Sequence, residues 1–148
     1  MAQAQFTDEK YFPDAITRPD PEDPLYKEFW DACKEGRLVV QACNDCATVQ
    51  HPPEIICHKC RGYDLGWKDV SGNGKIWTYV IVNRAAHPAM ADMIPYNVSL
   101  VQMDDEPDFY FLSNVIDVSS EDIEIGLPVT VVFERTEDDL VQPRFRRA

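Results

Sequence analysis

The chain has 148 residues, enough for one ordinary domain or for two very small modules that share a core. Its formal charge is −12, with 26 acidic against 14 basic residues, which argues against a nucleic-acid partner because a phosphate backbone is held mainly by Lys and Arg. There is no apolar run of roughly eighteen residues and no basic start followed by an apolar stretch, so the sequence predicts neither a membrane span nor a secretory signal. These features indicate a cytoplasmic protein.

Residues 1–36 are predicted to form an N-terminal arm and a helix. The arm is rich in proline and acidic side chains and cannot bury enough apolar surface to order itself, so we expect either a tail or a segment that lies on a partner. A helix is predicted over residues 24–35, with Asp23 as its N-cap. Phe29 and Trp30 belong to the aromatic stripe of this helix and are candidates for core residues or for anchors of a partner interface.

Two CxxC pairs separated by ten residues lie within residues 37–64 and consist of Cys43, Cys46, Cys57 and Cys60. In a reducing compartment such pairs indicate a metal site rather than disulfides. The short spacing within each pair lets both sulfurs of one turn reach the same ion, and two such turns complete a tetrahedral shell. A filled shell leaves no position for water, so we expect structural zinc. The spacing also fits a rubredoxin-like iron centre for electron transfer.

The remainder of the chain, residues 65–148, is predicted to be a β domain. Segments rich in β-branched and aromatic residues, bounded by Gly, Pro, Asn and Asp, are predicted as strands at 65–70, 75–84, 96–103, 109–118 and 128–135. Five strands with little helix between them favour a small barrel that is closed or partly open.

Five residues of the β domain are candidates for binding. Arg84 and His87 belong to a long loop between two predicted strands, and Arg144, Arg146 and Arg147 lie at the C-terminus of an otherwise acidic chain. Guanidinium groups there could hold a phosphate-bearing ligand or an acidic partner, or they could form a solvated end. The sequence contains no Ser-His-Asp set, phosphate-binding Gly loop or HExxH motif, so we expect no self-sufficient catalytic site.

The order of these motifs is specific. It runs from Phe29-Trp30 through Gly36-x-Leu38-x-x-Gln41-x-Cys43-x-x-Cys46, His51-Pro52-Pro53, Cys57-x-x-Cys60, Ser71-Gly72-x-Gly74 and Pro95-Tyr96 to Pro143-x-Phe145. From about Pro24 to Phe145 it resembles the thiolase-associated proteins that pair a rubredoxin-like zinc ribbon with an oligonucleotide/oligosaccharide-binding (OB) fold. That family usually has glycine directly after the second cysteine, where this chain has Ala47, and Gly62 takes the place of the glycine near the fourth.

The resemblance implies a mainly β fold with an N-terminal helix, a rubredoxin-like zinc ribbon and a C-terminal five-stranded OB barrel. It implies an accessory, non-catalytic subunit of an acyl-CoA thiolase, in a heterotetramer with a thiolase-fold partner. The subunit would stabilise the partner and help to form the channel for CoA and the acyl chain, so CoA would enter as part of the substrate of the complex. The alternatives are an accessory subunit of a retro-aldolase that degrades acyl-CoA side chains, and a nucleic-acid-binding OB protein.

Overall fold

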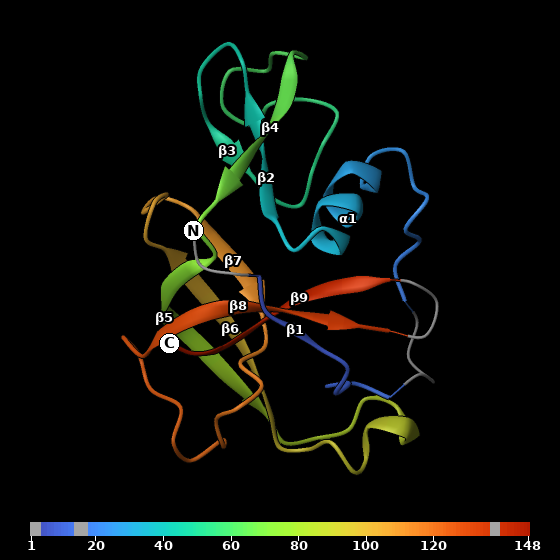
Figure 1. Cartoon of the computed structure of the whole chain (residues 1–148). Coiled ribbons are helices and arrows are strands. Elements are labelled where there is room, and N and C mark those ends of the chain that lie inside the picture. The colour runs from blue at the N-terminus through green and yellow to red at the C-terminus, as the bar shows by residue number, and fades with distance from the viewer. Residues whose placement is uncertain (1–3, 14–17, 137–139) are drawn as a thin grey trace.

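A computed structural model describes residues 4–13, 18–136 and 140–148 and confirms a mainly β fold (Figure 1). The elements are β1 (Phe6–Thr7), α1 (Lys27–Lys34), β2 (Leu38–Cys43), β3 (Val49–Gln50), β4 (Leu65–Val70), β5 (Asn73–Val82), the 3-10 turn η1 (Pro88–Met90), β6 (Tyr96–Met103), β7 (Tyr110–Ser113), β8 (Pro128–Arg135) and β9 (Val141–Arg147). Among the described residues, no helix is long and apolar enough to cross a membrane.

The larger sheet curls on itself. Its strands run in the order β1-β8-β5-β6-β7, and β9 pairs with β8. Residues of β6 alternate between buried and half-buried positions, because successive side chains of a strand point to opposite faces and one face fills the interior. A parallel bridge between Val115 and Phe145 joins the segment after β7 to β9 and brings the two edges of the sheet together.

Strand β7 is shorter than the predicted strand 109–118, because the chain leaves the β6 ladder after Ser113. The side chain of Asn97 then takes the place of the backbone ladder. Its amide donates to the carbonyl of Val115 at 2.8 Å and its oxygen accepts from the N–H of Val115 at 2.9 Å. The buried backbone is therefore satisfied without a longer strand.

A smaller sheet, ordered β3-β2-β4, carries the cysteines and leans on helix α1 (Figure 1). The helix begins at Lys27 rather than Pro24. The side chain of Asp23 accepts from the N–H of Leu25 at 2.9 Å, and its carbonyl accepts from the N–H of Tyr26 at 2.9 Å and of Lys27 at 2.8 Å, so a turn from Asp23 leads directly into the helix. It ends at Lys34, and Gly36 follows the C-cap with a φ of 75°, which glycine readily adopts.

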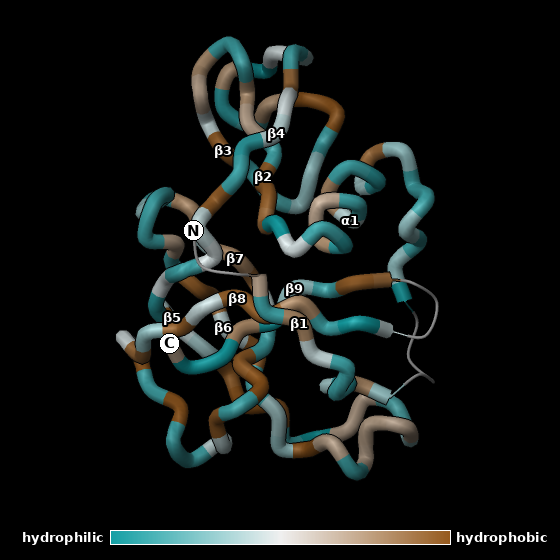
Figure 2. Tube along the Cα trace, viewed as in Figure 1, coloured by the Kyte–Doolittle hydropathy of each residue, from teal (hydrophilic) through white to brown (hydrophobic). Residues whose placement is uncertain are grey.

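Apolar residues, brown in Figure 2, occur along both sheets and the helix, and the buried ones form one hydrophobic core. The cluster includes Phe29 from α1, Val39 and Val40 from β2, Ile76 from β5, Phe111 from β7 and Phe145 from β9. The segment that carries the cysteines is thus packed onto the curled sheet by its own buried strand.

Part of the N-terminal arm lies on its own chain. Strand β1 pairs in parallel with β8, where the Phe6 ring lies 5.7 Å from that of Phe133 and beneath the guanidinium of Arg135 at 4.2 Å. The sequence had suggested that the arm is a tail or lies on a partner. In the structure its apolar contacts with β8 hold this part of the arm on its own chain. Residues 1–3 and 14–17 of the predicted arm lie outside the described residues.

Candidate functional site

The four predicted metal ligands come together at the tip of the smaller sheet. The sulfurs of Cys43, Cys46, Cys57 and Cys60 all lie within 4.8 Å of one another. The Cys43 and Cys60 sulfurs are 3.6 Å apart, and those of Cys46 and Cys57 are 3.7 Å apart. Four thiolates on a tetrahedral zinc, at Zn–S distances of about 2.3 Å, would be separated by about 3.8 Å. The donor set and its spacing therefore fit a structural zinc ion.

Two equivalent turns hold these sulfurs. The N–H of Ala47 donates to the backbone carbonyl of Cys43 at 2.9 Å, and the N–H of Arg61 donates to the backbone carbonyl of Cys57 at 3.0 Å. Ala47 and Arg61 both have left-handed backbones, with φ of 61° and 64°. This conformation favours glycine and explains the glycine expected after the second cysteine. The equivalent residue in the second turn is Arg61. The sequence had suggested Gly62 for this place.

The electrostatics of the cluster also call for a cation. Hydrogen bonds with Thr48 lower the pKa of Cys46 to about 6. At Cys60 the N–H of Gly62 lowers the pKa, but the adjacent sulfur of Cys43 and desolvation oppose it, and the net pKa is raised to about 12. Four thiolates this close repel one another unless a metal is present, and a bound zinc ion supplies the compensating charge.

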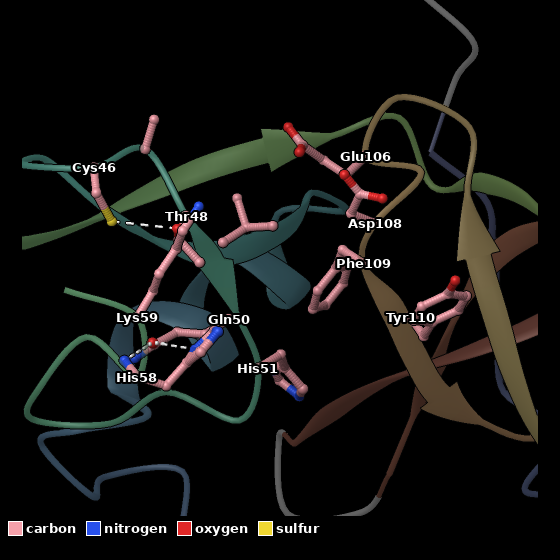
Figure 3. A pocket seen from close by; sticks show the side chains of 12 residues that line it. Cys46, Thr48, Gln50, His51, His58, Lys59, Glu106, Asp108, Phe109 and Tyr110 are labelled. Atoms are coloured by element: carbon pink, nitrogen blue, oxygen red, sulfur yellow. Dashed lines mark hydrogen bonds between the residues drawn. The ribbon is translucent and has the colours of Figure 1, made fainter. Parts of the chain in front are cut away.

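A groove of about 510 Å³ separates the smaller sheet from β7 (Figure 3). One wall is the segment 46–51 together with His58 and Lys59, and the other is the segment 106–110. Glu106 and Asp108 make the second wall acidic, and Phe109 and Tyr110 continue it toward the curled sheet. Strands far apart in the sequence thus line one polar groove.

His51 lies at the inner end of this groove and was not singled out by the sequence. Its ring centroid is 4.9 Å from that of Phe29 and 4.7 Å from that of Phe111. Burial lowers the pKa of His51 to about 4, and its Nδ1 has no hydrogen-bond partner among the described residues. The neutral imidazole is therefore a packing element between helix α1 and strand β7. No local motif reveals this, because the three rings come from distant segments.

An apolar face covers the outside of β5, β6 and β7. Trp77, Val80 and Leu112 are 49%, 60% and 61% exposed. The Trp77 ring lies 4.7 Å from that of Tyr110, and Leu112 is the register partner of Leu100 on β6. We call Trp77, Val80, Leu100, Tyr110 and Leu112 the outer face. Contiguous exposed apolar surface of this kind is typical of binding sites.

Helix residues Phe29 and Trp30, predicted as core residues or interface anchors, both lie in the core. Arg144 is also buried. Its guanidinium donates to Glu134 at 2.7 Å, to Asn114 at 2.9 Å and to Gln142 at 3.1 Å, so its donors are used within the chain.

The other predicted cationic residues are split between two ends of the curled sheet. Arg147 contacts Asp117 and is the register partner of Val129, beside the start of β5. Arg84 follows the far end of β5, and in the same loop the Nδ1 of His87 accepts from the N–H of Ala89 at 3.1 Å. A strand of ten residues spans about 30 Å, so the structure does not bring these two groups together.

Comparison with known proteins identifies the two halves of the chain. Residues 30–65 match the family model of the ChsH2 rubredoxin-like zinc ribbon domain, and residues 67–134 match that of the ChsH2 C-terminal OB-fold domain. A DUF35 domain-containing scaffold protein of Methanothermobacter thermautotrophicus is 31% identical over 103 residues, which cover 69% of this chain and 75% of that protein. The chain belongs to the DUF35 family. A solved DUF35 structure, described as "Ltp2-ChsH2(DUF35) aldolase", superposes with a TM-score of 0.74 and 30% identity over 88% of this chain and 98% of that one.

One DUF35 relative is a longer protein. A probable enoyl-CoA hydratase alpha subunit of Thermomonospora curvata is 33% identical over 132 residues, or 88% of this chain. This chain spans only 40% of the length of that relative. The matched stretch therefore makes up less than half of that relative.

Proposed function

We propose that this DUF35 chain is an accessory subunit that docks on a thiolase-fold enzyme acting on acyl-CoA thioesters. The outer face is the observation that carries the proposal, because a folded chain has little other reason to keep Trp77, Val80 and Leu112 in water. The partner would supply the catalytic groups, and a two-plus-two heterotetramer would be the assembly. The metal would hold the ribbon in shape beside the OB fold and would take no part in the chemistry.

The comparisons support an accessory role and widen the range of partners. The archaeal relative is named a scaffold protein, and the solved relative pairs ChsH2(DUF35) with Ltp2 in what is described as an aldolase. A retro-aldolase of thiolase fold is therefore the second candidate for the partner, beside a thiolase. A stand-alone nucleic-acid-binding role is disfavoured by the charge of −12.

The loop after β5 is the better candidate for contact with CoA phosphates. Arg84 is exposed and makes no ion pair with any described residue, whereas Arg144 and Arg147 are paired with acids of the same chain. A free guanidinium suits a phosphate group. In this proposal Arg84 and His87 border the CoA path, Arg144 and Arg147 stabilise the OB fold, and Arg146 is left for a partner.

Co-expression with a thiolase-fold protein from the genome of the same organism tests the docking proposal. Light scattering after size exclusion should show a heterotetramer for the wild type. Val80→Asp should weaken assembly at least tenfold, about 1.4 kcal/mol, because it places an unpaired charge in the interface. Ile125→Asp is the matched control, since Ile125 is 68% exposed but outside the outer face. Equal assembly of both variants would refute the outer face as the docking surface, and no complex at all would refute the function.

Turnover of the purified complex tests the contact with CoA. Arg84→Ala should raise KM for acyl-CoA about tenfold with little change in kcat, because a phosphate contact is made equally in the ground and transition states. Arg146→Ala serves as the comparison from the other end of the sheet. An unchanged KM in Arg84→Ala would remove Arg84 from the CoA path.

A further inference from the structure

Strand β9 reaches the edge of β7 that faces away from β6 only at Ser113 and beyond, where the Ser113 hydroxyl donates to the carbonyl of Pro143 and the N–H of Phe145 donates to the carbonyl of Asn114. From Tyr110 to Leu112 no described strand pairs with this edge. The N–H of Met103 donates to Phe109 at 3.3 Å, and Phe111 is opposite Val101 in the antiparallel ladder with β6. Because backbone groups of alternate residues point to opposite sides of a strand, those of Tyr110 and Leu112 point away from β6. β7 ends the order of the curled sheet, and within the described residues no backbone hydrogen bond reaches Tyr110 or Leu112 from that side.

Cavities lie beside this edge near both ends of β7. The groove of about 510 Å³ lies beside Phe109 and Tyr110, and a smaller cavity of about 140 Å³ lies beside Leu112. His51 lines both, and Figure 3 shows it across the groove from Phe109 and Tyr110. An extended chain that enters from the ribbon side could therefore run beside β7 toward α1 and β9.

The surroundings of the edge define what would fit there. Leu112 and the Trp77–Tyr110 ring pair offer apolar contacts to alternate side chains of an added strand. Asp108 is exposed at the start of the edge and forms no ion pair with a described residue, whereas Glu106 is paired with Lys68. A basic residue at one end of the added strand would complement Asp108. A second copy of this chain fits poorly, because each copy carries a charge of −12.

We infer that the edge of β7 binds an extended segment of the thiolase-fold partner as an added strand, with alternating apolar residues and a basic residue against Asp108. The inference rests on the proposed function and specifies how the partner is held. Main-chain hydrogen bonds to Tyr110 and Leu112 provide the attachment, and the outer face continues onto the added strand. The sheet of the OB fold would thus extend into the partner.

Amide hydrogen exchange, measured on the full chain alone and in complex with the co-expressed thiolase-fold protein, tests the inference. The amides of Tyr110 and Leu112 should exchange readily in the free chain and at least tenfold more slowly in the complex. Leu112→Pro, which removes the N–H, should weaken the complex at least tenfold, while Leu112→Val keeps the N–H and serves as its control. Thermal unfolding of both variants shows whether either has lost its fold. If Leu112→Pro is unfolded, the exchange data on the wild type alone decide whether the inference holds.

Four outcomes would overturn the inference. Slow exchange at Tyr110 and Leu112 in the free monomer would mean that the edge is already covered. A complex in which the two amides stay unprotected would refute strand addition and leave the proposed function standing. Protection that depends on self-association of the chain would assign the edge to a second copy. The absence of any complex would refute the proposed function and this inference together.

Discussion

Replacing His51 by phenylalanine should make the protein less sensitive to acid. In the fold the pKa of His51 is lowered from 6.5 to about 4, because its ring is buried between Phe29 and Phe111. Between these two values the unfolded chain binds a proton at this position and the folded chain does not, so stability falls as the pH falls. Each pKa unit corresponds to about 1.4 kcal/mol, which gives a loss of about 2 kcal/mol at pH 5 and about 3 kcal/mol at pH 4. His51→Phe keeps an aromatic ring in the site and removes the titration.

Urea unfolding at fixed free zinc between pH 5 and 7.5 measures the effect. Acid also displaces zinc from thiolates, but this contribution is common to both proteins and cancels in the difference between the variant and the wild type. We expect that difference to be constant above pH 7 and to shift by about 2 kcal/mol in favour of His51→Phe at pH 5. His87→Ala removes an imidazole from an exposed loop and is the matched control. Parallel pH profiles for the wild type and His51→Phe would show that the buried imidazole is not the cause.

Two further predictions concern the metal and the buried ion pair. Cys57→Ser should lower the zinc content well below one per chain, by elemental analysis, and should abolish the cooperative thermal transition, since structural zinc contributes roughly 10 kcal/mol or more to folding. Cys33→Ser should keep one zinc per chain, because Cys33 lies outside the cluster, and a drop in zinc content there would contradict the assignment of ligands. Arg144→Met should destabilise the fold by about 3–5 kcal/mol in chemical unfolding, because it leaves Glu134 charged and buried. Adding Glu134→Gln should recover most of that loss, and an equally unstable double variant would show that the packing of Arg144 matters more than its charge.

The sequence was most informative where the chemistry is local. Two residues between cysteines fix both sulfurs on one turn, so the convergence of Cys43, Cys46, Cys57 and Cys60 follows almost directly from their spacing. β-branched and aromatic segments predicted strands β4, β5, β6 and β8 closely, whereas the strand predicted at 109–118 is shorter in the structure. From the sequence, Gly62 takes the place of the glycine near the fourth cysteine, whereas the backbone geometry of the second turn places its left-handed residue at Arg61.

Features built from distant segments could not be predicted. The His51 packing site needs Phe29 and Phe111, which only the folded chain brings to it. Likewise, the sequence suggested that the C-terminal arginines hold a phosphate-bearing ligand or an acidic partner, or form a solvated end. The register of β9 on β8 instead places Arg144 against Glu134 and Arg147 beside Asp117. The sequence shows which residues are charged, but the fold decides which acidic residue pairs with each arginine.

The single core that joins the ribbon strand β2 to the curled sheet has a consequence for assembly. Val39 and Val40 of β2 lie just before Cys43 and pack in the same cluster as Phe111 of β7, so the ribbon and the strand that carries part of the outer face cannot unfold independently. Metal binding therefore stabilises the whole scaffold and not only its tip. Under the proposed function, the supply of zinc would set how many copies of this chain can assemble with a partner, although no zinc ligand belongs to the outer face.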